Sequence, residues 1–126
     1  SSGDMAYARQ AAGVAKGFKV FPSTEACLIE ARSGVFAGCI SATANLNADL
    51  CQQAWASGDT AALDKAVTIR KLFDGKPLVE GVKWTLAHIH GDPAWARVAP
   101  PLAPFAAADR AGANAGYDAA RAKRVA

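Results

Sequence analysis

The sequence has few aromatic residues, little excess charge and no long hydrophobic run. Aromatic residues make up 8% of the 126 residues, and the formal net charge is +3. Apart from Arg121, Lys123 and Arg124, the basic residues are scattered, so the chain lacks the dense basic stripe that nucleic-acid binding requires. The longest apolar stretch, 35–44, is too short and interrupted to span a bilayer, and no signal peptide is evident. We therefore expect no nucleic-acid partner, no membrane partner and a cytoplasmic location.

The sequence also lacks the spacings that hold metals or form disulfides. Cys27, Cys39 and Cys51 are odd in number and far apart, which indicates buried free thiols in a reducing compartment. His88 and His90 stand two residues apart on an expected helix, so they point to nearly opposite sides and cannot chelate one ion together. The sequence predicts no metal site and no cofactor.

Alanine, by contrast, is abundant, and it favours closely packed helices. Capping residues, glycines and prolines predict helices over 4–16, 25–32, 47–57, 59–73, 77–90 and 106–124. Two segments, Phe18–Phe21 and Phe36–Thr43, are predicted as strands, and the second is apolar or small throughout, as in a parallel sheet buried on both faces. Two such strands leave both sheet edges unpaired, so we expect a piece of a longer protein. Trp55, Trp84 and Trp95 are expected to be packing anchors.

One stretch carries a resemblance to a known family. Residues Gly38–Asn45, Gly-Cys-Ile-Ser-Ala-Thr-Ala-Asn, resemble the eighth strand of the dihydrodipicolinate synthase and N-acetylneuraminate lyase family, which typically shows Gly-x-Ile-Ser/Gly-x-x-x-Asn there. Phe18–Glu25 resembles the preceding strand and its loop. Further matches follow in the family's order at Ser57–Asp59, Gly81–Lys83 and Pro100–Leu102.

The resemblance implies an α/β fold, namely the C-terminal part of a TIM (β/α)8 barrel, about strands 7 and 8, followed by a C-terminal helical extension. Residues 1–46 would form the last βα units (helix 6, strand 7, helix 7 and strand 8). Residues 47–126 would form helix 8 and a C-terminal helical region, with the upstream half of the barrel absent from this chain. The family also implies a homo-oligomer, a dimer or a tetramer.

The start of the chain bears on the activity. Ser1–Asp4 resembles the family segment that follows the Schiff-base lysine, which places that lysine two positions before Ser1 and leaves no catalytic residue in this chain. The resemblance implies a lyase that joins the lysine to pyruvate or a 2-keto-3-deoxy acid and performs aldol condensation with an aldehyde, or the reverse cleavage. A dehydratase acting on a 2-keto-3-deoxy sugar acid is the alternative within the family. This chain alone is expected to be inactive.

The resemblance also assigns substrate-binding residues. The backbone carbonyl of Ile40 would face pyruvate, whereas Ser23, Thr24, Glu25, Ser41 and Thr43 would face the second substrate, with Ser1 beside the site. Many relatives have glycine followed by acidic residues where this chain has Ser23-Thr24-Glu25, which puts the identity of the second substrate in doubt. Two simpler interpretations stay open, a helix cap at Ser23 or Thr24 and a plain core position at Ile40. From another class, a non-catalytic helical domain that binds a partner protein also fits the sequence.

Overall fold

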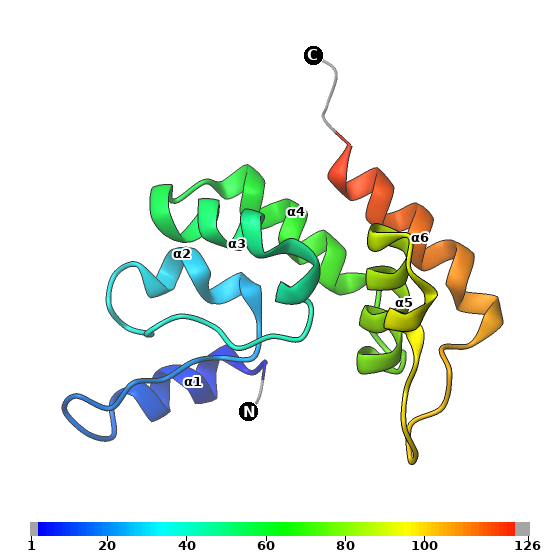
Figure 1. The fold of residues 1–126 in the computed structure, drawn as a ribbon. Helices are drawn as coiled ribbons and strands as arrows, with labels where there is room; N and C mark the ends of the chain where they lie inside the picture. Colours follow the sequence, from blue (N-terminus) through cyan, green and yellow to red (C-terminus); the bar gives the residue numbers. More distant parts are fainter. Residues whose placement is uncertain (1–2, 123–126) are drawn as a thin grey trace. The chain divides into compact units, whose positions relative to one another are not determined.

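The computed structural model describes residues 3–122. The chain divides into two compact units, Ser1–Val67 and Thr68–Ala126. Throughout the described part, regular structure consists of helices, which Figure 1 shows in chain order. None of these helices combines the length and the hydrophobicity needed to cross a membrane.

The first unit contains four helical segments and the start of a fifth: α1 (Met5–Ala12), η1 (Glu25–Cys27), α2 (Leu28–Ala31), α3 (Ala44–Ser57) and α4 (Thr60–Lys71). The side chain of Asp4 accepts hydrogen bonds from the backbone N–H groups of Ala6 and Tyr7, as expected for the cap of α1. Gly58 ends α3 with a φ of 74°, a left-handed conformation that glycine adopts without strain. The Asp59 side chain then accepts from the N–H of Ala62 and caps α4.

The core of this unit is small. Ala8, Cys27, Ala31 and Phe36 are buried together, and partly buried side chains from α1, α3 and the connections pack around them. In addition, α2 packs against α3 (Figure 1). These residues are short apart from Phe36, so the helices approach closely, as the alanine-rich composition predicts.

The two predicted strands are wrong, and with them the α/β barrel fold. No residue of 3–122 is in a strand. Segments 18–22 and 36–40 are joined by two backbone hydrogen bonds between described residues, from Ala37 N to Val20 O at 2.9 Å and from Ile40 N to Pro22 O at 3.1 Å, and the backbone bends at 35–37. Gly38, with a φ of 146°, interrupts the second segment, and residues 42–43 already turn into α3. A sheet strand needs a continuous ladder with its neighbours, and these segments do not form one.

Two of the predicted helix ends also differ. The first helix ends at Ala12 rather than at 16, and Gly13 follows as its C-cap. The helix predicted from Asn47 begins earlier, at Ala44, and Asn47 lies inside it with φ −144° and ψ 31°. The side chain of Asn47 is fully buried and its Nδ2 donates to the carbonyl of Ala66 in α4 at 3.2 Å. Asn47 therefore makes a tertiary hydrogen bond and does not cap the helix.

The second unit contains the end of α4, then α5 (Leu78–His90), η2 (Pro93–Ala96) and α6 (Ala107–Arg121). Pro77 precedes α5 and Gly91 ends it, as predicted. Helix α5 contacts both η2 and α6, and α5 and α6 lie side by side in Figure 1. Residues 123–124 of the predicted last helix lie outside the described residues.

Glycine permits the close packing of the second unit. A Cβ on Gly81, in α5, would stand 2.5 Å from Cδ1 of Phe73 and 3.1 Å from Cε2 of Phe105. A Cβ on Gly116, in α6, would stand 2.5 Å from Cδ2 of Leu72. Gly112, also in α6, has nothing within 4 Å of such a Cβ. Two of these three helical glycines therefore have a packing role, and Gly112 lacks one.

We expect Gly81→Ala and Gly112→Ala to change stability in opposite directions. The first pushes a methyl group into two aromatic rings, and the cost of overpacking exceeds the gain in helix propensity, so the free energy of unfolding falls by about 1–2 kcal/mol. The second replaces a glycine in open space and raises it by about 0.5–1 kcal/mol. Urea denaturation followed by tryptophan fluorescence measures both. Equal stabilisation by the two alanines would contradict the packing described at Gly81.

Candidate functional site

A buried carboxylate in the first unit gathers two of the predicted substrate-binding residues. Glu25 has no exposed surface, although glutamate is rarely buried unless it is paired. Ser41 Oγ donates to Glu25 Oε2 at 3.0 Å, and Thr43 Oγ1 donates to Glu25 Oε1. The two hydroxyl oxygens lie 3.0 Å apart. We call these three residues the Glu25 cluster.

Local backbone structure places each member of the Glu25 cluster. Thr24 Oγ1 accepts from the N–H of Ala26 at 3.3 Å, which starts η1 and fixes the backbone at Glu25. On the other side, Ala44 N donates to Ser41 O at 3.2 Å and Leu46 N donates to Thr43 O at 2.9 Å. This turn leads directly into α3 and places two hydroxyls, two residues apart, toward the same carboxylate.

The Glu25 cluster reaches the surface through Ser41. Thr43 and Glu25 are fully buried, whereas Ser41 is half-buried. Hydrogen bonds from Ser41 and Thr43 to the two oxygens of Glu25 hold both hydroxyls in a fixed orientation. The arrangement can therefore present one oriented hydroxyl to a polar ligand, while the carboxylate itself stays out of reach.

The other predicted site residues lie around this cluster in different environments. Thr24 is buried as the cap of η1, which confirms the capping interpretation, and Ser23 is half-buried. Ile40 is 68% exposed, so the alternative of a plain core position is wrong. Glu25 and Thr43 were expected to face a second substrate, but the full burial of both excludes direct contact in this structure. Ser1 lies outside the described residues.

The three cysteines are free thiols, as predicted, but only Cys27 is buried, and Cys39 and Cys51 are half-buried. Cys27 is buried and its Sγ donates to the carbonyl of Gly38 at 3.6 Å, while Cys51 donates to Asn47 Oδ1 at 3.2 Å. A hydrogen bond with Cys39, together with burial, raises the pKa of Cys27. Burial, and then the nearby charge of Glu25, raises the pKa of Cys51 to about 12. Thiols with raised pKa values are poor nucleophiles, so the pKa values of Cys27 and Cys51 do not favour catalysis by either cysteine.

Each histidine of the second unit interacts with one other side chain. Nε2 of His88 lies 3.0 Å from both carboxylate oxygens of Asp118, and the ring of His90 stacks on Trp95 with 5.2 Å between centroids. Within residues 3–122, no group of three or more histidine, cysteine or acidic side chains is arranged to hold a metal ion.

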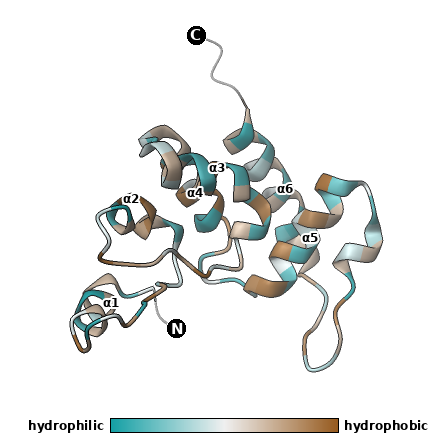
Figure 2. Ribbon diagram, turned by 60° about the vertical axis from the view of Figure 1, so that its left-hand side comes forward, coloured by the Kyte–Doolittle hydropathy of each residue, from teal (hydrophilic) through white to brown (hydrophobic). Residues whose placement is uncertain are grey.

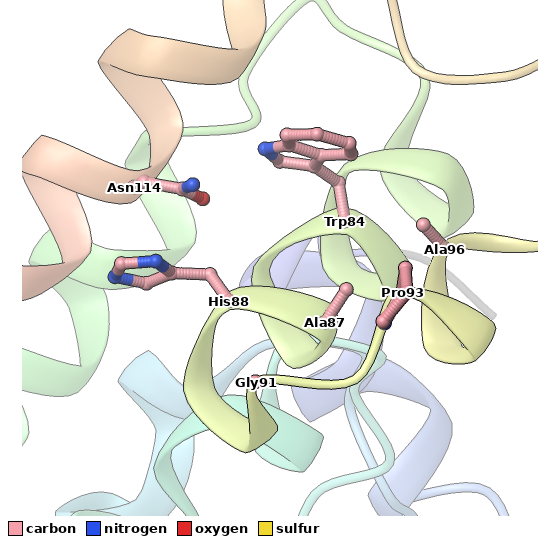
Figure 3. A pocket seen from close by; sticks show the side chains of 7 residues that line it. All are labelled: Trp84, Ala87, His88, Gly91, Pro93, Ala96 and Asn114. Atoms are coloured by element: carbon pink, nitrogen blue, oxygen red, sulfur yellow. The ribbon is translucent and has the colours of Figure 1, made fainter.

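The sequence analysis did not predict a hollow that lies in the second unit. Trp84 was interpreted as a packing anchor and Asn114 was given no role, yet both line this hollow between α5, η2 and α6 (Figure 3). No local motif joins two residues on different helices, so only the packing of those helices could reveal the hollow.

Comparisons of the chain with known family models, with curated proteins and with solved structures found no match. The family resemblance therefore stays a prediction from the residues themselves.

We expect Thr43→Val to be more destabilising than Thr85→Val. Both threonines are fully buried and the substitution is nearly isosteric, but the Thr43 hydroxyl donates to a buried carboxylate and the Thr85 hydroxyl to the helix carbonyl of Gly81. Loss of the first costs about 1.5–3 kcal/mol, and loss of the second about 1 kcal/mol or less. Chemical denaturation of the two variants measures the difference. Equal costs would show that the hydrogen bond from Thr43 to Glu25 stabilises the fold no more than one to a helix carbonyl.

We also expect Cys51 to resist alkylation in the native protein. Because its pKa rises from 9.0 to about 12, the thiolate is about a thousandfold rarer at pH 8 than in the unfolded chain. Iodoacetamide labelling with site-resolved mass spectrometry, in native buffer and in urea, measures the ratio of rates. Because the folded state holds the thiol proton more tightly than the unfolded chain, Cys51 also contributes to the free energy of unfolding. This contribution is complete below pH 9 and is lost as the pH rises toward 12. Fast labelling of native Cys51 would contradict the raised pKa.

Proposed function

We propose that this chain is part of a lyase that forms a Schiff base between a lysine and pyruvate or a 2-keto-3-deoxy acid, and that catalyses aldol condensation or cleavage. The lysine stands two positions before Ser1, outside the sequence given. The proposal rests on the resemblance at Gly38–Asn45 and Ser1–Asp4. It does not rest on the barrel, which the described structure contradicts.

The observation that carries the proposal is the Glu25 cluster. Ser41 and Thr43 were predicted as substrate-binding residues from the resemblance, and both donate to one buried carboxylate. A substrate with several hydroxyl or carboxylate oxygens needs donors and acceptors in fixed directions, because flexible ones lose entropy on binding. An oriented, half-buried Ser41 hydroxyl meets that need at one point.

Exposed apolar side chains in the first unit support a site completed by further residues of the protein. Phe18 is 62% exposed, Phe21 42% and Ile40 68%, and all three belong to segments 18–22 and 36–40. The connections on either side of α2 carry hydrophobic stretches in Figure 2. A Schiff-base lysine must be neutral to attack a carbonyl, and an apolar surrounding lowers its pKa. We infer that the lysine-bearing part of the protein covers this apolar surface.

The chemistry assigns limited roles to the residues of this chain. The lysine amine adds to the keto carbon and water leaves, which gives a protonated imine. In cleavage the imine accepts the electrons of the carbon–carbon bond that breaks, and an aldehyde leaves; in condensation the imine loses a proton from the adjacent carbon to a base of the site, and the resulting enamine attacks the aldehyde, whose oxygen takes up a proton. Hydrolysis of the imine then releases the product and the free lysine. Ser41, with Glu25 and Thr43 behind it, binds and orients the second substrate. Ser23 and the backbone carbonyl of Ile40 form the rest of the wall of the substrate site. A 2-keto-3-deoxy sugar acid dehydratase would use the same imine. The protein would act in the cytoplasm as a dimer or tetramer, without a cofactor.

Reduction with borohydride in the presence of pyruvate tests the proposal on the full-length protein that carries this chain. We expect a stable pyruvate adduct on the lysine two positions before Ser1, detected by peptide mass spectrometry. We further expect Ser41→Ala to leave this adduct intact but to raise the KM for the second substrate about tenfold, since one hydrogen bond is lost. Gly112→Ala serves as the matched surface control and should change neither.

The outcomes separate the proposal from its rival. No adduct would exclude the lyase, and an adduct on Lys16, Lys19 or Lys83 would exclude the placement of the lysine. The rival is a helical module that binds a partner protein, which the all-helical structure and the exposed Phe18, Phe21 and Ile40 favour. Two results together would support the rival: the 126-residue chain alone is stable and monomeric, and the full-length protein gives no adduct.

A further inference from the structure

Two thiols of the first unit, those of Cys27 and Cys39, lie next to each other although they are far apart in sequence. Sγ of Cys27 lies 3.6 Å from the carbonyl oxygen of Gly38, which belongs to the same rigid peptide group as Cα of Cys39. Cys39 also packs against the core cluster that contains Cys27, and their side chains share a hydrogen bond. We call these two residues the cysteine pair.

The two members of the cysteine pair differ in their access to solvent. Cys27 has no exposed surface, whereas Cys39 is half-buried, so an oxidant dissolved in water meets Cys39 first. Cys51 is half-buried as well, but burial raises its pKa to about 12, and oxidants react with the thiolate. An accessible thiol with a second thiol poised beside it is an arrangement found at redox-sensing cysteines.

We propose that hydrogen peroxide converts the cysteine pair into a reversible disulfide. The sulfur of Cys39 attacks the peroxide and the O–O bond breaks, so that Cys39 becomes a sulfenic acid and water leaves. Sγ of Cys27 then attacks this sulfur, the S–O bond breaks, and the leaving oxygen takes up the thiol proton of Cys27 as a second water. Two thiols thereby lose two electrons and two protons to one peroxide molecule, and a dithiol reductant restores them by exchange.

The disulfide joins two segments that the fold already holds together. Cys27 follows Glu25 by two residues, and Cys39 precedes Ser41 by two. Ser41 Oγ donates to Glu25 Oε2 at 3.0 Å, so the same two segments are in contact at the Glu25 cluster. Two cysteines can be bridged without backbone movement only where their backbones are close, and this pair meets that condition. The reaction does not depend on the proposed Schiff-base lysine.

Peptide mapping of the full-length protein that carries this chain tests the proposal. The reduced protein is treated with hydrogen peroxide in native buffer, its remaining thiols are blocked with N-ethylmaleimide, and it is digested without reduction. Trypsin places Cys27 in peptide 20–32 and both other cysteines in peptide 33–65. We expect these two peptides to be joined by a disulfide that dithiothreitol separates. The proposal fails if they are not joined, or if a disulfide forms within peptide 33–65 instead.

Serine variants identify the partner of Cys27. Cys51→Ser is the matched control and should leave the yield of joined peptides unchanged. Cys39→Ser should reduce this yield at least about tenfold, because the thiol that reacts with peroxide is lost. The opposite pattern would show that Cys51 is the partner, and the proposed pair would be wrong.

Dimedone, which traps sulfenic acids, tests the order of the two steps. In Cys27→Ala the sulfenic acid of Cys39 has no thiol beside it, so dimedone labelling of Cys39 should rise at least about tenfold above that of the unsubstituted protein. Equal labelling in the two proteins would show that Cys27 does not capture the sulfenic acid, which would overturn the proposal. The serine variants keep the buried thiol of Cys27, so they test the pair even where Cys27→Ala lowers stability.

Discussion

A carboxylate without water must have hydrogen-bond donors, and this requirement organises the first unit. Glu25 has no exposed surface, and it lies next to Ala26 and Cys27, the second of which belongs to the apolar core. Removing a carboxyl group from water costs free energy unless hydrogen-bond partners replace the water, so the chain segment that supplies Ser41 and Thr43 must stay beside η1. The chain that leads from segment 36–40 into α3 is thereby tied to Glu25, although it is far from it in sequence.

The second unit depends instead on close approach between apolar surfaces. Gly81 and Gly116 have no Cβ, which lets the side chains of Phe73, Phe105 and Leu72 lie where a Cβ would otherwise stand. The packing of α5 against α6 also buries Nε1 of Trp84 and Oδ1 of Asn114, which have no hydrogen-bond partner among the described residues.

The two units thus offer different chemistry. The Glu25 cluster groups a buried carboxyl group with two hydroxyls, and that of Ser41 is half-buried. The hollow in the second unit is lined mostly by apolar side chains, together with His88 and Asn114.

The sequence by itself determined the helices whose ends are encoded locally. Asp4, Asp59, Pro77 and the glycines after α3 and α5 start or stop helices through their own conformational limits and side-chain hydrogen bonds, and the structure has the helices there. The family resemblance assigned Ser41 and Thr43 to a substrate site, and that assignment stays a prediction, while the structure shows both hydroxyls donating to Glu25. The prediction of two strands is wrong because a strand needs neighbouring strands to hydrogen-bond with, and local β-propensity does not provide them. The burial of Glu25, the kink at Asn47 and the meeting of Trp84 with Asn114 were decided by tertiary structure, since each depends on a partner far away in the sequence.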